Sequence, residues 1–185
     1  MNSWSVVCLV AVAVGAASPV AVRAQGGTEA VVPQAIDPTW LAVNAASRTA
    51  TFELIAGLTG VNGALNFNGF RDGGLTLTVP LGWNVVMHFR NHDGMLPHSA
   101  EVIDTVHPLP VQPVTPAFPK AFTVRLAEGI PSEGRDDLRF IADKGGSYLI
   151  FCGVPGHGAA GMWVRLEVSG SVQKPSLAAT PAGKP

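Results

Sequence analysis

Charged residues are scarce in this chain of 185 residues, since only 14% are Asp, Glu, Lys or Arg. The 12 basic and 13 acidic side chains give a formal net charge of -1 at pH 7, and neither sign gathers in a long run. Proteins that bind nucleic acid need a basic arm or patch, because phosphate contacts supply much of the affinity. The composition therefore gives no support to nucleic-acid binding.

Cysteine is equally scarce, with Cys8 and Cys152 as the two instances. Cys8 lies in an apolar segment over residues 1–24 that is typical of a signal peptide, with small residues before an expected cleavage after Ala24. Its removal leaves a single thiol and excludes a disulfide within the mature chain. An unpaired exported thiol is either buried and inert or occupied by a ligand, because free thiols outside the cytoplasm oxidise.

The signal segment carries no Lys or Arg ahead of its apolar stretch. If it stays uncleaved, residues 4–22 are just long enough to span a bilayer. We expect a periplasmic or secreted protein, with anchoring to the outer face of the cytoplasmic membrane as the alternative.

Sustained helical periodicity is also missing after the signal segment, whereas glycine and proline are abundant at 21 and 15 residues. Turn chemistry separates short segments in which apolar and polar residues alternate, at residues 51–55, 75–79, 85–89, 122–126, 138–140, 148–152 and 164–168, with a further strand at 99–103. Such spacing predicts an all-β, antiparallel Greek-key β-sandwich. The one expected helix is a short N-terminal segment over residues 39–46, capped by Asp37 with Pro38 at its first position.

The length suits a single domain. We expect an N-terminal extension at residues 25–48 and the β-sandwich domain at residues 49–169. The last segment, residues 170–185, is rich in Ser, Ala, Pro and Lys and has no apolar face, so we expect a disordered tail.

The densest chemical signal is the spacing C-x4-H-x4-M formed by Cys152, His157 and Met162 at the end of a predicted strand. A second imidazole is available from His98, which follows Pro97 at a loop-to-strand junction. Two imidazoles, a thiolate and a weakly bound thioether form the ligand set of a mononuclear copper site. Soft sulfur ligands of this kind suit both copper oxidation states better than they suit zinc.

The remaining histidines, His88, His92 and His107, are expected to be ordinary surface or core residues. Met87 shares a face with apolar neighbours and is expected in the core. Met95 also lies near the predicted site and could supply the thioether in place of Met162. No role is assigned to His92 or Met95.

The motif resembles the sulfocyanin and rusticyanin group of cupredoxins, the type 1 blue-copper proteins. Four stretches carry the resemblance: Tyr148–Phe151 before the cysteine, Leu96–His98, Leu65–Gly69, and Val79–Val85. It covers roughly residues 51–168. The resemblance implies that His98, Cys152 and His157 are equatorial copper ligands and Met162 the axial one. It also implies that Ser99 orients the thiolate from outside the ligand set.

The same resemblance implies a carrier of single electrons on one Cu(I)/Cu(II) ion, not an enzyme and without a small-molecule substrate. A periplasmic c-type cytochrome and a terminal oxidase are the implied redox partners, docking weakly and transiently on a monomer. The glycines around His157 allow its ring edge to emerge in a small apolar patch, which we expect to be the electron port and to consist of Val154, Pro155, Gly158, Ala159 and Ala160. An apolar shell and a weak thioether disfavour Cu(II), which predicts a high reduction potential.

Two other functions compete with electron transfer. Copper delivery or storage is the alternative, since such a protein would hold mainly Cu(I) in an exposed Met/His site and lack strong colour. A copper oxidase is disfavoured because the five histidines cannot build a second multi-copper centre. A binuclear copper centre needs a second cysteine four residues after the first, and Gly156 stands there.

Overall fold

The computed structural model describes residue 1 and residues 34–185. The predicted signal peptide lies outside the described residues. Among those that are described, no helix is both long and apolar enough to cross a membrane.

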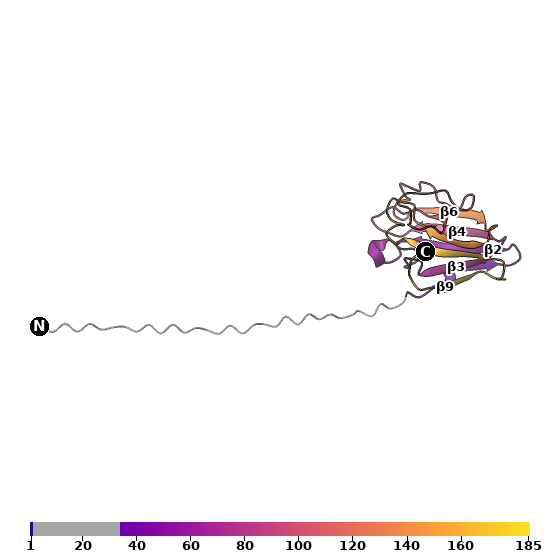
Figure 1. Ribbon diagram of the computed structural model, residues 1–185, viewed down its shortest axis with the longest axis horizontal. Helices are drawn as coiled ribbons and strands as arrows, with labels where there is room; N and C mark the ends of the chain where they lie inside the picture. The colour runs from indigo at the N-terminus through magenta and orange to yellow at the C-terminus, as the bar shows by residue number, and fades with distance from the viewer. Residues whose placement is uncertain (2–33) are drawn as a thin grey trace. The chain divides into compact units, whose positions relative to one another are not determined.

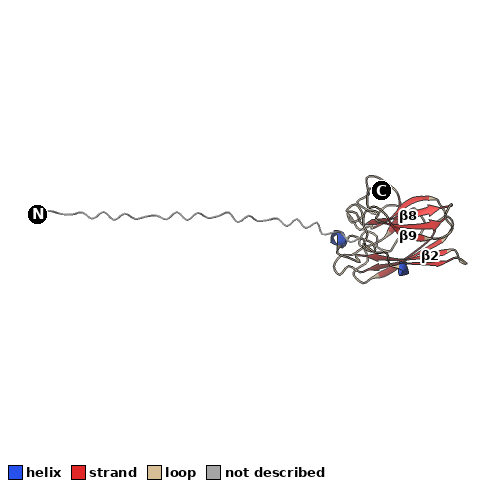
Figure 2. Cartoon of the chain, turned by 90° about the horizontal axis from the view of Figure 1, so that it is seen from below, coloured by secondary structure: helices blue, strands red, loops and turns tan. Residues whose placement is uncertain are grey.

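Two β-sheets face each other in residues 34–185, with β8 and β9 in one layer and β2 in the other (Figure 2). The first sheet has the order β1 (Leu41–Asn44), β2 (Thr49–Ala56), β4 (Asn84–Asn91), β6 (Arg135–Ile141). The second has the order β5 (Glu101–Asp104), β7 (Gly146–Phe151), β8 (Trp163–Ser169), β3 (Leu75–Pro80), β9 (Ser176–Ala179). Figure 1 shows the first sheet from β2 through β4 to β6. The predicted all-β sandwich is confirmed.

Alternating side chains build the core between the sheets. In β2 every second residue is buried, from Ala50 through Phe52 and Leu54 to Ala56, and β4 contributes Met87 among its own buried residues. Fully burying one large apolar side chain contributes about 1.5–3 kcal/mol to folding. Because a slip by one residue would turn this face to water, the alternation specifies the register of both strands.

The pairing is mixed rather than purely antiparallel, which corrects the expectation. Strands β2 and β4 run parallel, as do β3 and β8, while the other neighbours are antiparallel. Alternation of side chains marks a half-buried strand but carries no information about the direction of its partner.

The predicted helix over residues 39–46 is wrong beyond its first turn. Asp37 does accept a hydrogen bond from the Thr39 amide at 2.8 Å, and the turn it caps is the 3-10 helix η1 (Pro38–Trp40). The chain then enters β1, where Leu41 pairs with Phe52 of β2. Backbone pairing along β2 outweighs a weak local helix preference, so part of the predicted N-terminal extension belongs to the sandwich. A second short 3-10 helix, η2 (Val61–Ala64), lies in the connection between β2 and β3.

The predicted disordered tail is also partly wrong. Strand β9 pairs antiparallel with β3, with Leu177 opposite Leu77. Farther along, the Arg165 guanidinium donates to the carbonyls of Pro181 and Lys184 at 3.3 Å each. The free edge of β3 offers backbone hydrogen bonds to any extended segment, so a segment without an apolar face can still be ordered.

The predicted strand over residues 122–126 is absent from the structure apart from one isolated bridge between Glu101 and Phe122. Phe122 and Val124 point outward, while Thr123 is buried and its amide donates to the Ala100 carbonyl at 2.8 Å. This segment belongs to the long connection from β5 to β6, which runs back along the edge of β5. That course places it against the residues that precede β5, where the site lies.

Candidate metal centre

The loop that joins β7 to β8 carries three of the predicted ligands. Cys152 follows the last residue of β7, and Met162 precedes the first residue of β8. The Cys152 amide donates to the Met162 carbonyl at 3.1 Å, and the Met162 amide donates to the His157 carbonyl at 3.1 Å. These bonds close the loop onto itself, so that positions far apart within it are held together by the backbone.

Two glycines make this loop possible. Gly161 has φ +102°, and a Cβ there would stand 2.6 Å from a carboxylate oxygen of Asp72. A Cβ at Gly158 would stand 2.0 Å from the ring of Phe151, so the backbone lies directly on that ring. Both positions require the absence of a side chain.

His98 reaches the site from the neighbouring strand, because it lies just before β5, whose first residue, Glu101, pairs with Phe151 at the end of β7. Its amide donates to the Ile130 carbonyl at 3.1 Å, and its carbonyl accepts from the Ile130 amide at 2.7 Å. The long β5–β6 connection thus anchors the backbone of His98 on both sides. The side chain is fully buried.

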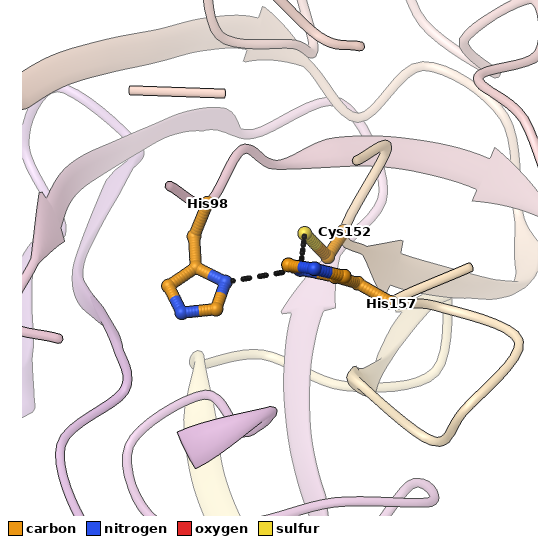
Figure 3. A group of neighbouring side chains, drawn as sticks. All are labelled: His98, Cys152 and His157. Carbon is orange, nitrogen blue, oxygen red and sulfur yellow. Dashed lines mark hydrogen bonds between the residues drawn. The ribbon is translucent and has the colours of Figure 1, made fainter. Parts of the chain in front are cut away.

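The three donor side chains converge. Their ligand atoms all lie within 4.8 Å of one another, with 3.3 Å between the two Nδ1 atoms of His98 and His157 and 3.7 Å between the Cys152 Sγ and the His157 Nδ1 (Figure 3). Figure 3 shows both rings and the sulfur directed toward a common point. The structure therefore brings together three of the four predicted ligands, which come from two distant parts of the chain.

This donor set fits a small metal ion. Ligand atoms that lie 3.3–3.7 Å apart can share one ion, because metal–nitrogen and metal–sulfur bonds are about 2.0–2.3 Å long. One thiolate with two imidazoles is the donor set of blue-copper sites.

The Cys152 thiol is fully buried, and it is the free cysteine of the described residues. Burial raises its pKa to about 11, although the amides of Ser99 and Val154 and the Ser99 hydroxyl favour the thiolate. In this buried position the thiolate is stable only when a bound cation balances its charge, and the amides then add hydrogen bonds to the sulfur.

Both imidazoles are held neutral. Burial lowers the pKa of His98, against the opposing effect of Asp93, and burial together with nearby His98 lowers the pKa of His157. Neutral imidazole has the free lone pair that a metal needs.

Ser99 lies next to the cysteine, and its amide and hydroxyl contact the Cys152 sulfur. Its hydroxyl donates to the Leu126 carbonyl at 2.7 Å and accepts from the Gly153 amide at 3.1 Å. It ties the residue after Cys152 to the β5–β6 connection.

Met162 is fully buried in the core, and the backbone bonds described above connect it to Cys152 and His157. Its assignment as the axial ligand stays a prediction. Met95, the other methionine near the site, is 89% exposed, which is unsuitable for a ligand inside a closed site.

The predicted docking patch is exposed in part. Pro155, Ala159 and Ala160 are exposed and Val154 is half-buried, as is His157 itself. Gly158 is buried against Phe151 and does not belong to the surface, which corrects the expectation for this residue. Its small size serves packing beneath the loop.

The other histidines lie outside the cluster. His88 hydrogen-bonds to Asp137 at 2.7 Å on the exposed face of the first sheet, and His92 lies 3.6 Å from Glu133. Met87 is buried in the core as predicted.

Asp93 is the residue that the sequence interpretation missed. Its carboxylate lies 2.9 Å from the Nε2 atom of His98, and the pair is buried. Burial disfavours the charged carboxylate, but hydrogen bonds from His98, Met95 and Leu96 outweigh this and hold the pKa of Asp93 below its usual range. An acidic residue five positions before a candidate ligand was visible in the sequence, but nothing local indicated that the loop folds back.

Comparison with known proteins places the chain in a family. The model of the sulfocyanin (SoxE) domain matches residues 38–179. A sulfocyanin from Sulfolobus acidocaldarius is 30% identical over 117 residues, which span 60% of this chain and 58% of that relative, somewhat over half of its length.

Solved structures agree with this result. Rusticyanin from Thiobacillus ferrooxidans superimposes with a TM-score of 0.50 at 25% identity, over 70% of this chain and 86% of rusticyanin. A structure of rusticyanin variants gives a TM-score of 0.51 at 25% identity, over 66% and 78% of the two chains.

Proposed function

This chain belongs to the sulfocyanin domain family of cupredoxins, and we propose that it is a periplasmic blue-copper protein that carries single electrons between redox partners. Its cofactor is one copper ion, and cupredoxins of this group transfer electrons rather than convert substrates. When bound, copper supplies a one-electron Cu(I)/Cu(II) couple. His98, Cys152 and His157 would hold the ion, with Met162 as the fourth ligand.

The observation that carries the proposal is the convergence of the Cys152 Sγ atom and the two Nδ1 atoms, with two of the three side chains fully buried. Cys152 and His98 are fully buried, and the loop and the Ile130 pairing fix their backbones. Fast electron transfer needs ligands that move little when the charge changes, and a rigid site meets this need. A delivery protein would instead need ligands open to exchange.

Electrons enter and leave through His157. It is half-buried, whereas His98 and Cys152 are fully covered. The exposed Pro155, Ala159 and Ala160 surround its loop with small apolar groups. Such a surface suits weak, short-lived contacts with a redox protein.

The partners that fit this role are a c-type cytochrome as donor and a terminal oxidase as acceptor, with the chain acting as a monomer. Cleavage after Ala24 would deliver it to the periplasm, and an uncleaved segment would hold it at the outer face of the cytoplasmic membrane.

Visible absorption of the oxidised, copper-loaded protein tests the function. We expect an intense blue band from sulfur-to-copper charge transfer, absent in Cys152→Ser. A wild-type protein that binds copper without this band would refute the carrier and favour copper delivery or storage.

The docking surface is tested separately with Ala159→Lys and Ala160→Lys. Each places a charge beside the port, so we expect slower electron exchange with a c-type cytochrome and an unchanged blue band. Ala45→Lys is the control, because Ala45 is exposed in the turn beside the start of β4, whereas the site lies beyond the end of β4. Equal rates for all three variants would contradict this port.

A further inference from the structure

A buried carboxylate contacts one of the proposed copper ligands. The Asp93 Oδ2 atom lies 2.9 Å from the His98 Nε2 atom, and the two side chains are 8% and 0% exposed. A carboxylate buried without partners costs several kcal/mol, so its position needs an explanation.

The loop before β5 is built around this carboxylate. The Asp93 Oδ1 atom accepts from the amides of Met95 at 2.8 Å and Leu96 at 3.2 Å. The Asp93 amide donates to the Asn91 side chain at 3.0 Å, and Asn91 donates onward to the carbonyls of Leu96 and Ile130. Together these bonds restrain the carboxylate, and within residues 34–185 its Oδ2 atom is hydrogen-bonded to His98.

Packing against Gly57 also restrains Asp93. Gly57 has φ +65°, and a Cβ there would stand 2.6 Å from the Asp93 Cβ. The two backbones are therefore in close contact, which restrains the backbone position of Asp93.

We propose that Asp93 is a positioning residue for His98: its carboxylate holds the proton on Nε2, directs the Nδ1 lone pair toward Cys152 and His157, and shifts the bound copper toward its oxidised state. This inference rests on the proposed function. A carboxylate only accepts hydrogen bonds, so Nε2 must donate and Nδ1 is the free nitrogen. That nitrogen is the one that lies 3.3 Å from the His157 Nδ1.

The effect on copper follows from charge. A negative carboxylate bonded to a ligand makes that ligand more basic and stabilises Cu(II) more than Cu(I). Asp93 therefore opposes the apolar shell, which favours Cu(I). The balance of the two sets the reduction potential.

The test is the midpoint potential of copper-loaded Asp93→Asn. Its amide oxygen can still accept from Met95 and Leu96, but the charge facing His98 is gone. We expect the blue band to remain and the preference for Cu(II) over Cu(I) to fall about tenfold to hundredfold, a rise of about 60–120 mV at about 59 mV per tenfold for one electron.

Asp137→Asn is the matched control, because Asp137 forms the same kind of pair with His88 on an exposed face outside the site. We expect its potential to equal that of the wild type. If Asp93→Asn shows the blue band and the wild-type potential, the inference is overturned while the proposed function stands. If the wild type itself shows no blue band, the proposed function fails first and the inference falls with it.

Nuclear magnetic resonance of the reduced wild-type protein tests the same point without any variant, should Asp93→Asn fail to fold. We expect nitrogen shifts that show the Nε2-protonated form of His98, with a low-field proton that exchanges slowly with water. A His98 protonated on Nδ1, or an Nε2 proton that exchanges as fast as the Nδ1 proton of exposed His88, would overturn the inference.

Discussion

Glu101 gives the sharpest prediction about stability. Its side chain is fully buried beside Gly153, and neither carboxylate oxygen has a hydrogen-bond partner of normal geometry in the described part of the chain. Burial raises its pKa to about 7 from an ordinary 4.5, although the Val114 amide opposes the rise. The folded protein therefore binds this proton more tightly than the unfolded chain does.

The sign of the pH dependence follows. The stability that the proton contributes is fully present below about pH 4.5 and is lost as the pH rises to about 7. The interval of about 2.5 pH units corresponds to about 3 kcal/mol, at about 1.4 kcal/mol per unit. Well above pH 7 the contribution of the Glu101 proton to the free energy of unfolding is lost completely, and this contribution no longer changes with pH.

The substitution Glu101→Gln removes the titration and keeps the shape. We expect the free energy of unfolding of the variant, relative to wild type, to rise by about 3 kcal/mol between pH 4 and pH 8. Urea unfolding of the metal-free proteins, followed by tryptophan fluorescence, measures both curves. The exposed Glu128→Gln serves as control and should run parallel to wild type. Parallel curves for Glu101→Gln as well would refute the reasoning, since the carboxyl would then titrate alike in the folded and unfolded states.

Three further outcomes are expected. Gly158→Ala should destabilise the protein by about 1–3 kcal/mol in urea unfolding, because the new Cβ would overlap the Phe151 ring. Gly170→Ala is the control, since Gly170 has open space around it, and equal stabilities of the two variants would contradict this packing. Met162→Leu, which preserves volume, should keep the blue band and raise the midpoint potential, and an unchanged potential in redox titration would remove Met162 from the ligand set. Leu177→Asp should lower the free energy of unfolding by about 1–2 kcal/mol in thermal or urea unfolding, because half-buried Leu177 packs on the core. Ser176→Asp, on the exposed face of the same strand, should leave the stability unchanged. An unchanged stability of Leu177→Asp would mean that the packing of β9 contributes nothing to folding.

Local patterns predicted the strands well where one face is buried and the other is wet. The segment at residues 85–89 lies within β4, because alternating apolar and polar residues reflect which side chains of a strand are buried. The same rule failed at residues 122–126, where Phe122 and Val124 face outward and Thr123 bonds to Ala100. Strand β9 was missed because edge pairing depends on backbone groups, which every residue carries and no side-chain pattern reveals.

The sequence by itself determined the chemistry of the β7–β8 loop. Cys152, His157 and Met162 lie within one short segment between two strands, so the covalent chain keeps them within one loop. Their residue types then restrict the metal, because few ions suit a thiolate, an imidazole and a thioether together.

Only the tertiary structure decided how the site is completed. His98 meets His157 across 59 positions of sequence, and Asp93 reaches His98 only because the loop folds back over Gly57. The pairing of His98 with Ile130 depends on the course of the β5–β6 connection. Contacts between segments that are distant in the chain arise from packing of the whole sandwich, and packing leaves no local periodicity from which they could be predicted.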